Sequence, residues 1–179
     1  KDIIIPAKIL NEISKILSES EMEETAVDLY LNPKKAIFLF DDTKVILRLL
    51  EGQFVRYEDI LPKDSQCRVV LNKSDFMNSI ERASLLAKNN LIKLDIKDHN
   101  MEITSKSEEG TVKEEIIVSK EGSDLIIGFN SKYLSDALKA IDDEEIVMLF
   151  NTAISPCLIR PLTGEAYEYL VLPVRITNN

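Results

Sequence analysis

The chain has 179 residues, 45% hydrophobic and 30% charged, with a formal net charge of −9. This composition is enough for a folded core and excludes a disordered chain, while the negative charge excludes a surface that grips nucleic acid over its whole extent. The longest apolar runs reach five or six residues, against the roughly 20 that a membrane-spanning helix needs, so no membrane contact is expected.

The first predicted elements are a short apolar strand over residues 2–5 and a helix that Pro6 can begin. Strands are predicted after the acidic loop 19–24, and the last two are joined by a hairpin turn at Asp41-Asp42-Thr43. These strands cover residues 26–31, 36–40 and 44–50. The helix has one apolar face, formed at helical spacing by Ile9, Leu10, Ile13, Ile16 and Leu17.

The same order of elements then occurs twice more. A strand over 67–71 precedes a helix that Asn72 or Ser74 can cap, and a strand over 125–129 precedes a helix that Asn130 or Ser131 can cap. The first helix is followed by strands at 91–96, 101–105 and 112–118, and the second by strands at 145–150, 157–162 and 168–176. The apolar faces consist of Phe76, Ile80, Ala83 and Ala87 in one helix and Leu134, Ala137, Leu138 and Ile141 in the other.

The chain therefore contains three units of a strand, a helix and three strands, each of about 60 residues. One helix on one small sheet cannot bury both the helix and the sheet edges, so we expect units to pair. The predicted fold class is α+β, with helices on one face of antiparallel sheets. Because three is odd, one unit is expected to lack a partner, and spacing alone does not say which.

Basic residues gather in the three predicted helices although the chain is acidic. Each helix has a net charge of +1, which leaves −12 for the rest. Weakly positive helices suit a surface that moves along DNA without gripping it, because each further phosphate contact adds affinity and salt dependence. Solvated helices also commonly carry lysine, so the charges alone do not establish contact with DNA.

Residues 49–62, LLEGQFVRYEDILP, resemble a segment of the bacterial sliding clamps, the beta subunits of DNA polymerase III. The matching positions are Gly52, Phe54, Tyr57, Ile60, Leu61 and Pro62. Three more segments are similar to the same family in the same order, namely residues 3–13, 127–141 and 169–176. The resemblance therefore extends over essentially the whole chain.

The resemblance implies a DNA clamp fold in which residues 1–62 are the second half of the family's middle domain and residues 63–179 its C-terminal domain. The chain would then be a fragment. In the family, protomers of three domains close head to tail into a homodimeric ring whose helices line the hole. The implied function is that of a cytoplasmic, non-catalytic processivity factor without cofactor or metal. The implied partners are double-stranded DNA, the DNA polymerase III alpha subunit, the clamp loader and repair polymerases.

The family binds short, mostly apolar peptides of its partners in a groove between the middle and last domains. The residues at the end of the chain suit this role, because Pro173 favours a sheet edge and Arg175 can bond a peptide carbonyl or carboxylate. Tyr133 adds a ring with a hydroxyl, which is common at interfaces. An ordinary final strand is the alternative. By position, the groove residues are Val55, Ile60, Tyr133, Pro156, Leu170, Val171, Leu172, Pro173, Val174, Arg175 and Ile176.

The chain departs from the family pattern at the groove. Val55 stands where the family often has proline, and Asp59 stands where arginine is frequent. The family's Gly-His-Arg-Leu segment, which forms one wall of the groove, is missing with the absent half-domain. We therefore expect this chain to bind peptides weakly.

The resemblance and the helix charges together predict a set of cations that face DNA. Lys8 and Lys15 are seven residues apart, as are Lys132 and Lys139, so each pair shares a helix face. The full set is Lys8, Lys15, Lys73, Arg82, Lys88, Lys132 and Lys139. Leu85 and Leu86 match positions where protomers meet in the family, with core packing as the alternative.

Two other functions remain possible on the residues alone. A metal-dependent hydrolase would use the carboxylates at 41–42 and 142–145, but these lack a partner histidine or a spaced third carboxylate, and His99 lies in a predicted tight turn. A peptide-binding adaptor that does not encircle DNA is the second alternative. Cys67 and Cys157 fit no metal spacing and are expected to be reduced structural thiols.

Overall fold

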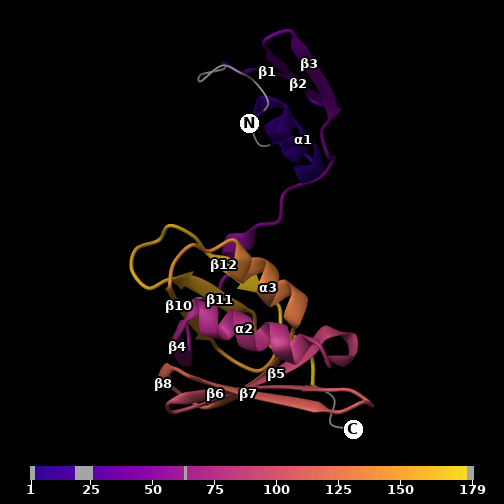
Figure 1. Cartoon of the computed structure of the whole chain (residues 1–179). Helices are drawn as coiled ribbons and strands as arrows, with labels where there is room; N and C mark the ends of the chain where they lie inside the picture. Colours follow the sequence, from indigo (N-terminus) through magenta and orange to yellow (C-terminus); the bar gives the residue numbers. More distant parts are fainter. Residues whose placement is uncertain (1–2, 19–25, 63, 177–179) are drawn as a thin grey trace. The chain divides into compact units, whose positions relative to one another are not determined.

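The computed structural model describes residues 3–18, 26–62 and 64–176, and Figure 1 labels its elements. The chain divides into two compact units, Lys1–Arg56 and Tyr57–Asn179. This division falls a few residues before Pro62, where the resemblance implies a domain boundary. Among the described residues, no helix combines the length and the apolar character needed to cross a membrane.

The first unit contains one helix and one antiparallel sheet. The helix is α1 (Ala7–Ser18), and the sheet has the order β1 (Asp28–Leu31), β2 (Lys35–Phe40) and β3 (Thr43–Arg48). The hairpin turn predicted near Asp41 is present, with Phe40 paired to Thr43 across it. The small core of this unit consists of Ile13, Ala36, Phe38, Phe40 and Leu47.

The strand predicted over residues 2–5 is not formed at residues 3–5, and residue 2 lies outside the described residues. The backbone N–H of Leu50 donates one hydrogen bond to the carbonyl of Ile4, over 2.9 Å. A strand needs a neighbour along its whole length, and one hydrogen bond does not supply it. The prediction was therefore wrong, because no strand among the described residues pairs with residues 3–5.

The second unit contains two helices and two sheets. Its first half consists of η1 (Tyr57–Asp59), β4 (Cys67–Asn72), α2 (Lys73–Ser84), η2 (Lys88–Asn90), β5 (Leu91–Lys97), β6 (Asn100–Lys106), β7 (Thr111–Ile117) and β8 (Ser119–Gly122). Its second half consists of β9 (Leu125–Asn130), α3 (Ser131–Lys139), β10 (Glu145–Phe150), β11 (Cys157–Pro161) and β12 (Tyr169–Val171).

The two halves of this unit exchange their first strands. One sheet has the order β7-β6-β5-β9, so β9 of the second half lies beside β5 of the first. The other sheet has the order β12-β11-β10-β4-β8, so β4 of the first half lies beside β10 of the second. All of these pairings are antiparallel. The expectation that repeated units pair is confirmed for these two.

Helices α2 and α3 pack against each other (Figure 1). The side chain of Asn72 accepts a hydrogen bond from the N–H of Asp75 at the start of α2, and Asn130 accepts one from Lys132 at the start of α3. Both asparagines are therefore the N-caps that the sequence suggested. Helix α2 ends at Ser84, so Lys88 lies in η2, and α2 has no net charge instead of the +1 expected.

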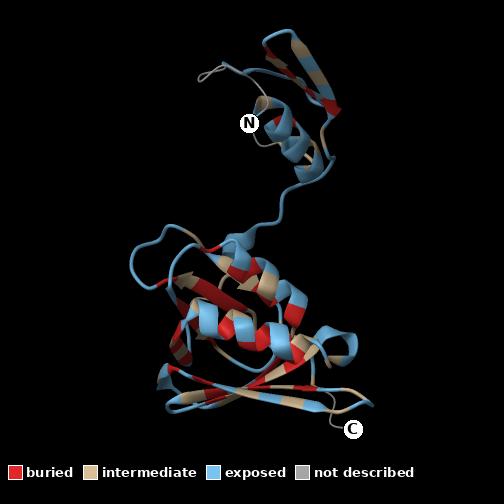
Figure 2. Ribbon diagram, in the orientation of Figure 1, coloured by how far each residue is buried: buried red, intermediate tan, exposed pale blue. Residues whose placement is uncertain are grey.

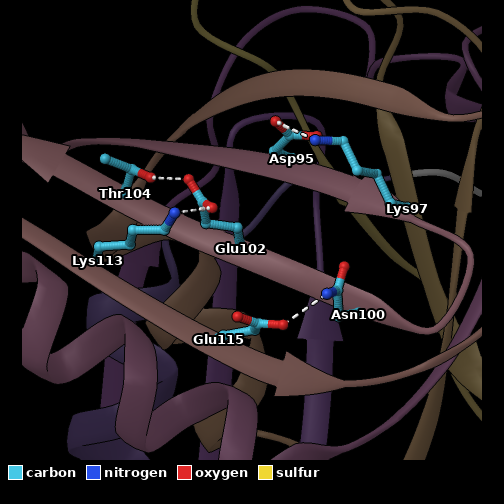
Figure 3. A network of polar contacts seen from close by, with 7 residues as sticks. All are labelled: Asp95, Lys97, Asn100, Glu102, Thr104, Lys113 and Glu115. Carbon is cyan, nitrogen blue, oxygen red and sulfur yellow. Dashed lines mark hydrogen bonds and ion pairs between the residues drawn. The ribbon is translucent and has the colours of Figure 1, made fainter.

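The core of the second unit lies between the helices and the sheets (Figure 2). Alternation along β5 and β6 puts Ile92, Leu94, Ile96, Met101 and Ile103 in the core, all fully buried. The opposite face of this sheet carries a row of three directly paired carboxylates, Asp95, Glu102 and Glu115. Lys97, Lys113 and Asn100 contact them over 3.4, 2.6 and 2.5 Å (Figure 3), which offsets the repulsion between like charges.

The predicted strand 168–176 is divided in the structure. It pairs with β11 only over Tyr169–Val171, and after Pro173 it crosses to the other sheet, where the N–H of Val174 donates to the carbonyl of Gly128 over 2.8 Å. Pro173 has no N–H and cannot continue a ladder. The sequence prediction of one long strand was therefore wrong, and Pro173 lies in the crossing between the two sheets, after the end of β12.

Candidate functional site

An apolar groove lies between α3 and the edge strand β12. Its volume is about 460 Å³, and it is lined by Tyr133, Asp136, Ala137, Tyr169, Leu170, Val171 and Leu172. Two large side chains in it are mainly in contact with solvent, because Tyr133 is 58% exposed and Leu172 is 62% exposed. A partner that covers such side chains is bound more tightly, because burial of apolar surface lowers the free energy of the complex by about 25 cal/mol for each Å².

Strand β12 is held firmly by its surroundings. It ends the five-stranded sheet, paired on one side with β11, and the hydroxyl of Tyr169 donates to the carbonyl of Ala140 over 3.2 Å. The ring of Tyr167 lies 5.5 Å from that of Tyr169, and its hydroxyl donates to Asp143 over 2.6 Å. Burial, and next the bond to this carboxylate, raise the pKa of Tyr167 far above its usual value. The groove is therefore preformed on one side.

The position of β12 gives the groove two kinds of binding group. The described residues place no further strand beyond β12 in its sheet, so its outer edge can pair with an extended chain. Apolar side chains of that chain would meet Leu170 and Leu172, and the Tyr133 hydroxyl and the Asp136 carboxylate can accept hydrogen bonds from its polar groups. The site therefore suits an extended, mostly apolar peptide.

Residues 58–175 match the family described as the C-terminal domain of the DNA polymerase III beta subunit. The chain belongs to this family. It is 38% identical to the beta sliding clamp of Staphylococcus epidermidis, over 98% of this chain and 47% of that protein.

Solved structures of the family have the same fold. The DNA polymerase sliding clamp of Bacillus subtilis is 37% identical, with a TM-score of 0.88 over 99% of this chain and 47% of that one. The DNA polymerase III beta subunit of Thermotoga maritima is 30% identical, with a TM-score of 0.88 over 98% and 48%. The predicted α+β fold class is confirmed, and the chain spans about half the length of the relatives it matches.

The structure brings part of the predicted groove set together. Tyr133, Leu170, Val171 and Leu172 line the groove, whereas Ile60, Pro156 and Pro173 are in the same compact unit but not in its lining. Val174, Arg175 and Ile176 follow the crossing to β9, so they leave the groove. Val55 is exposed and belongs to the first compact unit.

Three lining residues were not predicted to be in the groove. Asp136 and Ala137 follow Tyr133 at spacings of three and four, which places them on the same side of a helix. In the sequence, Asp136 contributes to the charge of the helix and Ala137 to its apolar face, and neither role by itself predicts a groove. Tyr169 adjoins the predicted run, and only the pairing of β12 with β11 shows which part of this run forms the wall.

Some of the cations expected to face DNA already have a partner within the protein, and others do not. Arg82 pairs with Glu114 over 2.6 Å, Lys88 with Glu108 over 3.2 Å, and Lys15 with Glu12 over 3.0 Å. The ammonium group of Lys73 donates to the carbonyl of Ile141 over 2.5 Å, which turns it towards the protein. Lys8, Lys132 and Lys139 are exposed and form no ion pair with any residue that the structure describes.

Leu85 and Leu86 lie just beyond the end of α2. Leu85 is 81% exposed and Leu86 is partly buried. Core packing therefore does not account for Leu85, and its predicted role at a contact between protomers stays a prediction. Cys67 and Cys157 are both free and buried, and burial raises the pKa of each thiol. Within residues 3–18, 26–62 and 64–176, no group of three or more His, Cys, Asp or Glu side chains is placed to hold a metal ion.

Proposed function

We propose that this chain is the C-terminal part of a sliding clamp, a non-catalytic subunit that keeps a DNA polymerase on duplex DNA. Residues 1–62 serve as the second half of a middle domain, and residues 63–179 serve as the C-terminal domain. The observation that carries the proposal is the apolar groove between α3 and the edge strand β12, in a chain 38% identical to a beta sliding clamp.

The groove binds partner proteins through short peptides. A peptide pairs with the outer edge of β12 and inserts apolar side chains between Tyr133 and Leu172. The partners are the DNA polymerase III alpha subunit, the clamp loader and repair polymerases, and the complete protein closes into a homodimeric ring. We expect residues 1–179 by themselves to bind such peptides weakly, because they contain no Gly-His-Arg-Leu segment like the one that forms one wall of the groove in the family.

The peptide site can be tested by fluorescence anisotropy with a labelled Gln-Leu-x-Leu-Phe peptide. We expect weak, saturable binding that the double substitution Tyr133→Ala, Leu172→Ala weakens at least tenfold, since removal of one central anchor commonly costs over 1 kcal/mol. Ile117→Ala is the matched control, because Ile117 is exposed on β7 and does not line the groove. Equal affinity of the double variant and the control would refute this groove as the binding site.

DNA passes the helices without being held tightly. The exposed Lys132 and Lys139 lie on α3, and the other cations of α2 and η2 are mostly paired within the protein. A few unpaired cations give weak, sequence-independent attraction to phosphates. This arrangement suits a protein that must remain mobile on DNA, and retention then comes from the closed ring.

The contact with DNA can be tested on short duplexes at several salt concentrations. Lys132→Ala with Lys139→Ala is expected to reduce the slope of log affinity against log salt by about 2. Lys97→Ala is the control, because Lys97 lies on the outer face of the four-stranded sheet, beside Asp95. An unchanged slope would favour the alternative of a peptide-binding adaptor that does not encircle DNA.

A further inference from the structure

Two tyrosines of the second compact unit join the two walls of the groove. The hydroxyl of Tyr169 donates to the carbonyl of Ala140 over 3.2 Å, and the hydroxyl of Tyr167 donates to the carboxylate of Asp143 over 2.6 Å. Ala140 is the C-cap of α3, and Asp143 lies in the segment between α3 and β10. Among the described residues, no other hydrogen bond joins α3 and the segment after it to β12 and the segment before it.

Both tyrosines lie on the side of the sheet that carries the core. Tyr169 is paired with the buried Ile159 of β11, and paired residues of neighbouring strands point to the same face. Tyr167 comes two residues earlier, and its ring centroid lies 5.5 Å from that of Tyr169. Both rings pack against the core cluster of this unit. Each ring is therefore held by packing, and each hydroxyl is held by a hydrogen bond.

The end of α3 provides an acceptor at the right place. The last carbonyl groups of a helix have no partner within it, and that of Ala140 accepts from Tyr169 instead. Ala140 comes seven residues after Tyr133, so it continues the helix face on which Tyr133 and Ala137 line the groove. The hydrogen bond from Tyr169 therefore ties the helical wall of the groove to the strand that forms the other wall.

We propose that Tyr167, through its bond to Asp143, acts as a brace that fixes the separation of the two groove walls and thereby sets the affinity of the groove for a peptide. Tyr167 does not line the groove, so it acts through Tyr169, which does, and it is a positioning residue. This role rests on the proposed function of the groove as a peptide-binding site. A side chain outside the binding surface then controls how tightly that surface binds.

The size of the effect follows from how few contacts hold β12. The strand has three residues and pairs, among the described residues, with β11 alone, and one hydrogen bond of its own, from Tyr169, joins it to the end of α3. Short segments with few contacts open locally at a small cost in free energy. The observed dissociation constant rises by the inverse of the fraction of molecules that is competent to bind. We therefore expect loss of the brace to weaken peptide binding about three- to tenfold.

Fluorescence anisotropy with the labelled Gln-Leu-x-Leu-Phe peptide tests the brace. Tyr167→Phe removes only the hydroxyl and should raise the dissociation constant about three- to tenfold. Asp143→Ala should have the same effect, and the double variant should bind no more weakly than either single variant, because both changes remove one bond. Asp143→Asn keeps an acceptor oxygen and should bind as the unchanged chain does. Glu144→Ala is the matched control for the lost charge, because no described side chain bonds its carboxylate.

Amide hydrogen exchange of the free chain gives a second readout that does not need a peptide. In Tyr167→Phe, exchange should be faster in β12 and unchanged in β5, whereas a general loss of stability would speed it in both strands. The proposal is overturned by unchanged affinity of Tyr167→Phe, by an equal loss in Glu144→Ala, or by exchange that is unchanged in β12 or faster throughout the unit. If the unchanged chain binds no peptide, the proposed function fails, and the role of the brace in binding fails with it.

Discussion

The close contact at Gly128 gives a quantitative prediction about the end of the chain. A Cβ atom at this position would lie 2.7 Å from the carbonyl oxygen of Val174, 2.8 Å from Cγ1 of Ile176 and 3.3 Å from Cδ1 of Leu91. The first contact involves backbone, which cannot rotate away. Gly128→Ala must therefore either strain the structure or push residues 174–176 off β9.

The cost of each response can be compared. Keeping the segment in place would overpack the site, which typically costs about 1–3 kcal/mol. Releasing it loses the hydrogen bond from the Val174 N–H, worth about 0.5–1.5 kcal/mol, and some burial of Ile176. Release costs less than overpacking, so we expect the segment to be released. The free energy of unfolding of the second unit should then fall by about 1.5 kcal/mol.

Urea unfolding, followed by circular dichroism, measures this loss. Gly110→Ala is the matched control, because its Cβ would be 3.6 Å from Leu86 Cδ1, an ordinary contact. In a chain that ends at Pro173, the effect of Gly128→Ala should fall below about 0.5 kcal/mol, since the clashing atoms are gone. An undiminished cost in the shortened chain would refute the reasoning and place the strain at Leu91 within the sheet.

Two other predictions concern stability. The buried Ser105 hydroxyl donates to the carbonyl of Ala83 near the end of α2, over 2.6 Å, so Ser105→Ala should cost about 1–3 kcal/mol in urea unfolding, against almost nothing for the exposed Ser119→Ala. The bond from Lys113 lowers the pKa of Glu102 below its ordinary 4.5, so its stabilising effect is present at neutral pH and is lost as pH falls through this lowered pKa. Glu102→Gln should flatten the fall in stability between about pH 5 and pH 3, and an equally steep fall would contradict this cause.

The repeated elements were predictable because they depend on local pattern. Helical spacing located α1, α2 and α3, and the caps Asn72 and Asn130 follow from the preference of asparagine for the N-cap position, just before the first turn. The hairpin at Asp41-Asp42 follows from turn chemistry. In the groove, the positions of Tyr133 and Leu172 followed from the resemblance, and no local pattern distinguishes this wall from an ordinary final strand.

Features that depend on distant partners were missed. Strand β8, with the sequence Ser-Lys-Glu-Gly, has little strand propensity and forms because it pairs with β4. The exchange of β4 and β9 between repeats has no local signal at all. Lys73 was assigned to DNA by its charge, but the acceptor that holds it, the carbonyl of Ile141, is 68 residues away. Such contacts follow from topology, which periodicity does not specify.

The exchange of strands also bears on the origin of the fold. When β4 and β9 each complete the other repeat's sheet, neither repeat can be removed without opening the other. Fusion of two genes for a unit that already paired with itself produces this arrangement in one step, since both halves keep every contact they had as separate chains. Residues 57–179 would then be such a fused pair, folded as one compact unit.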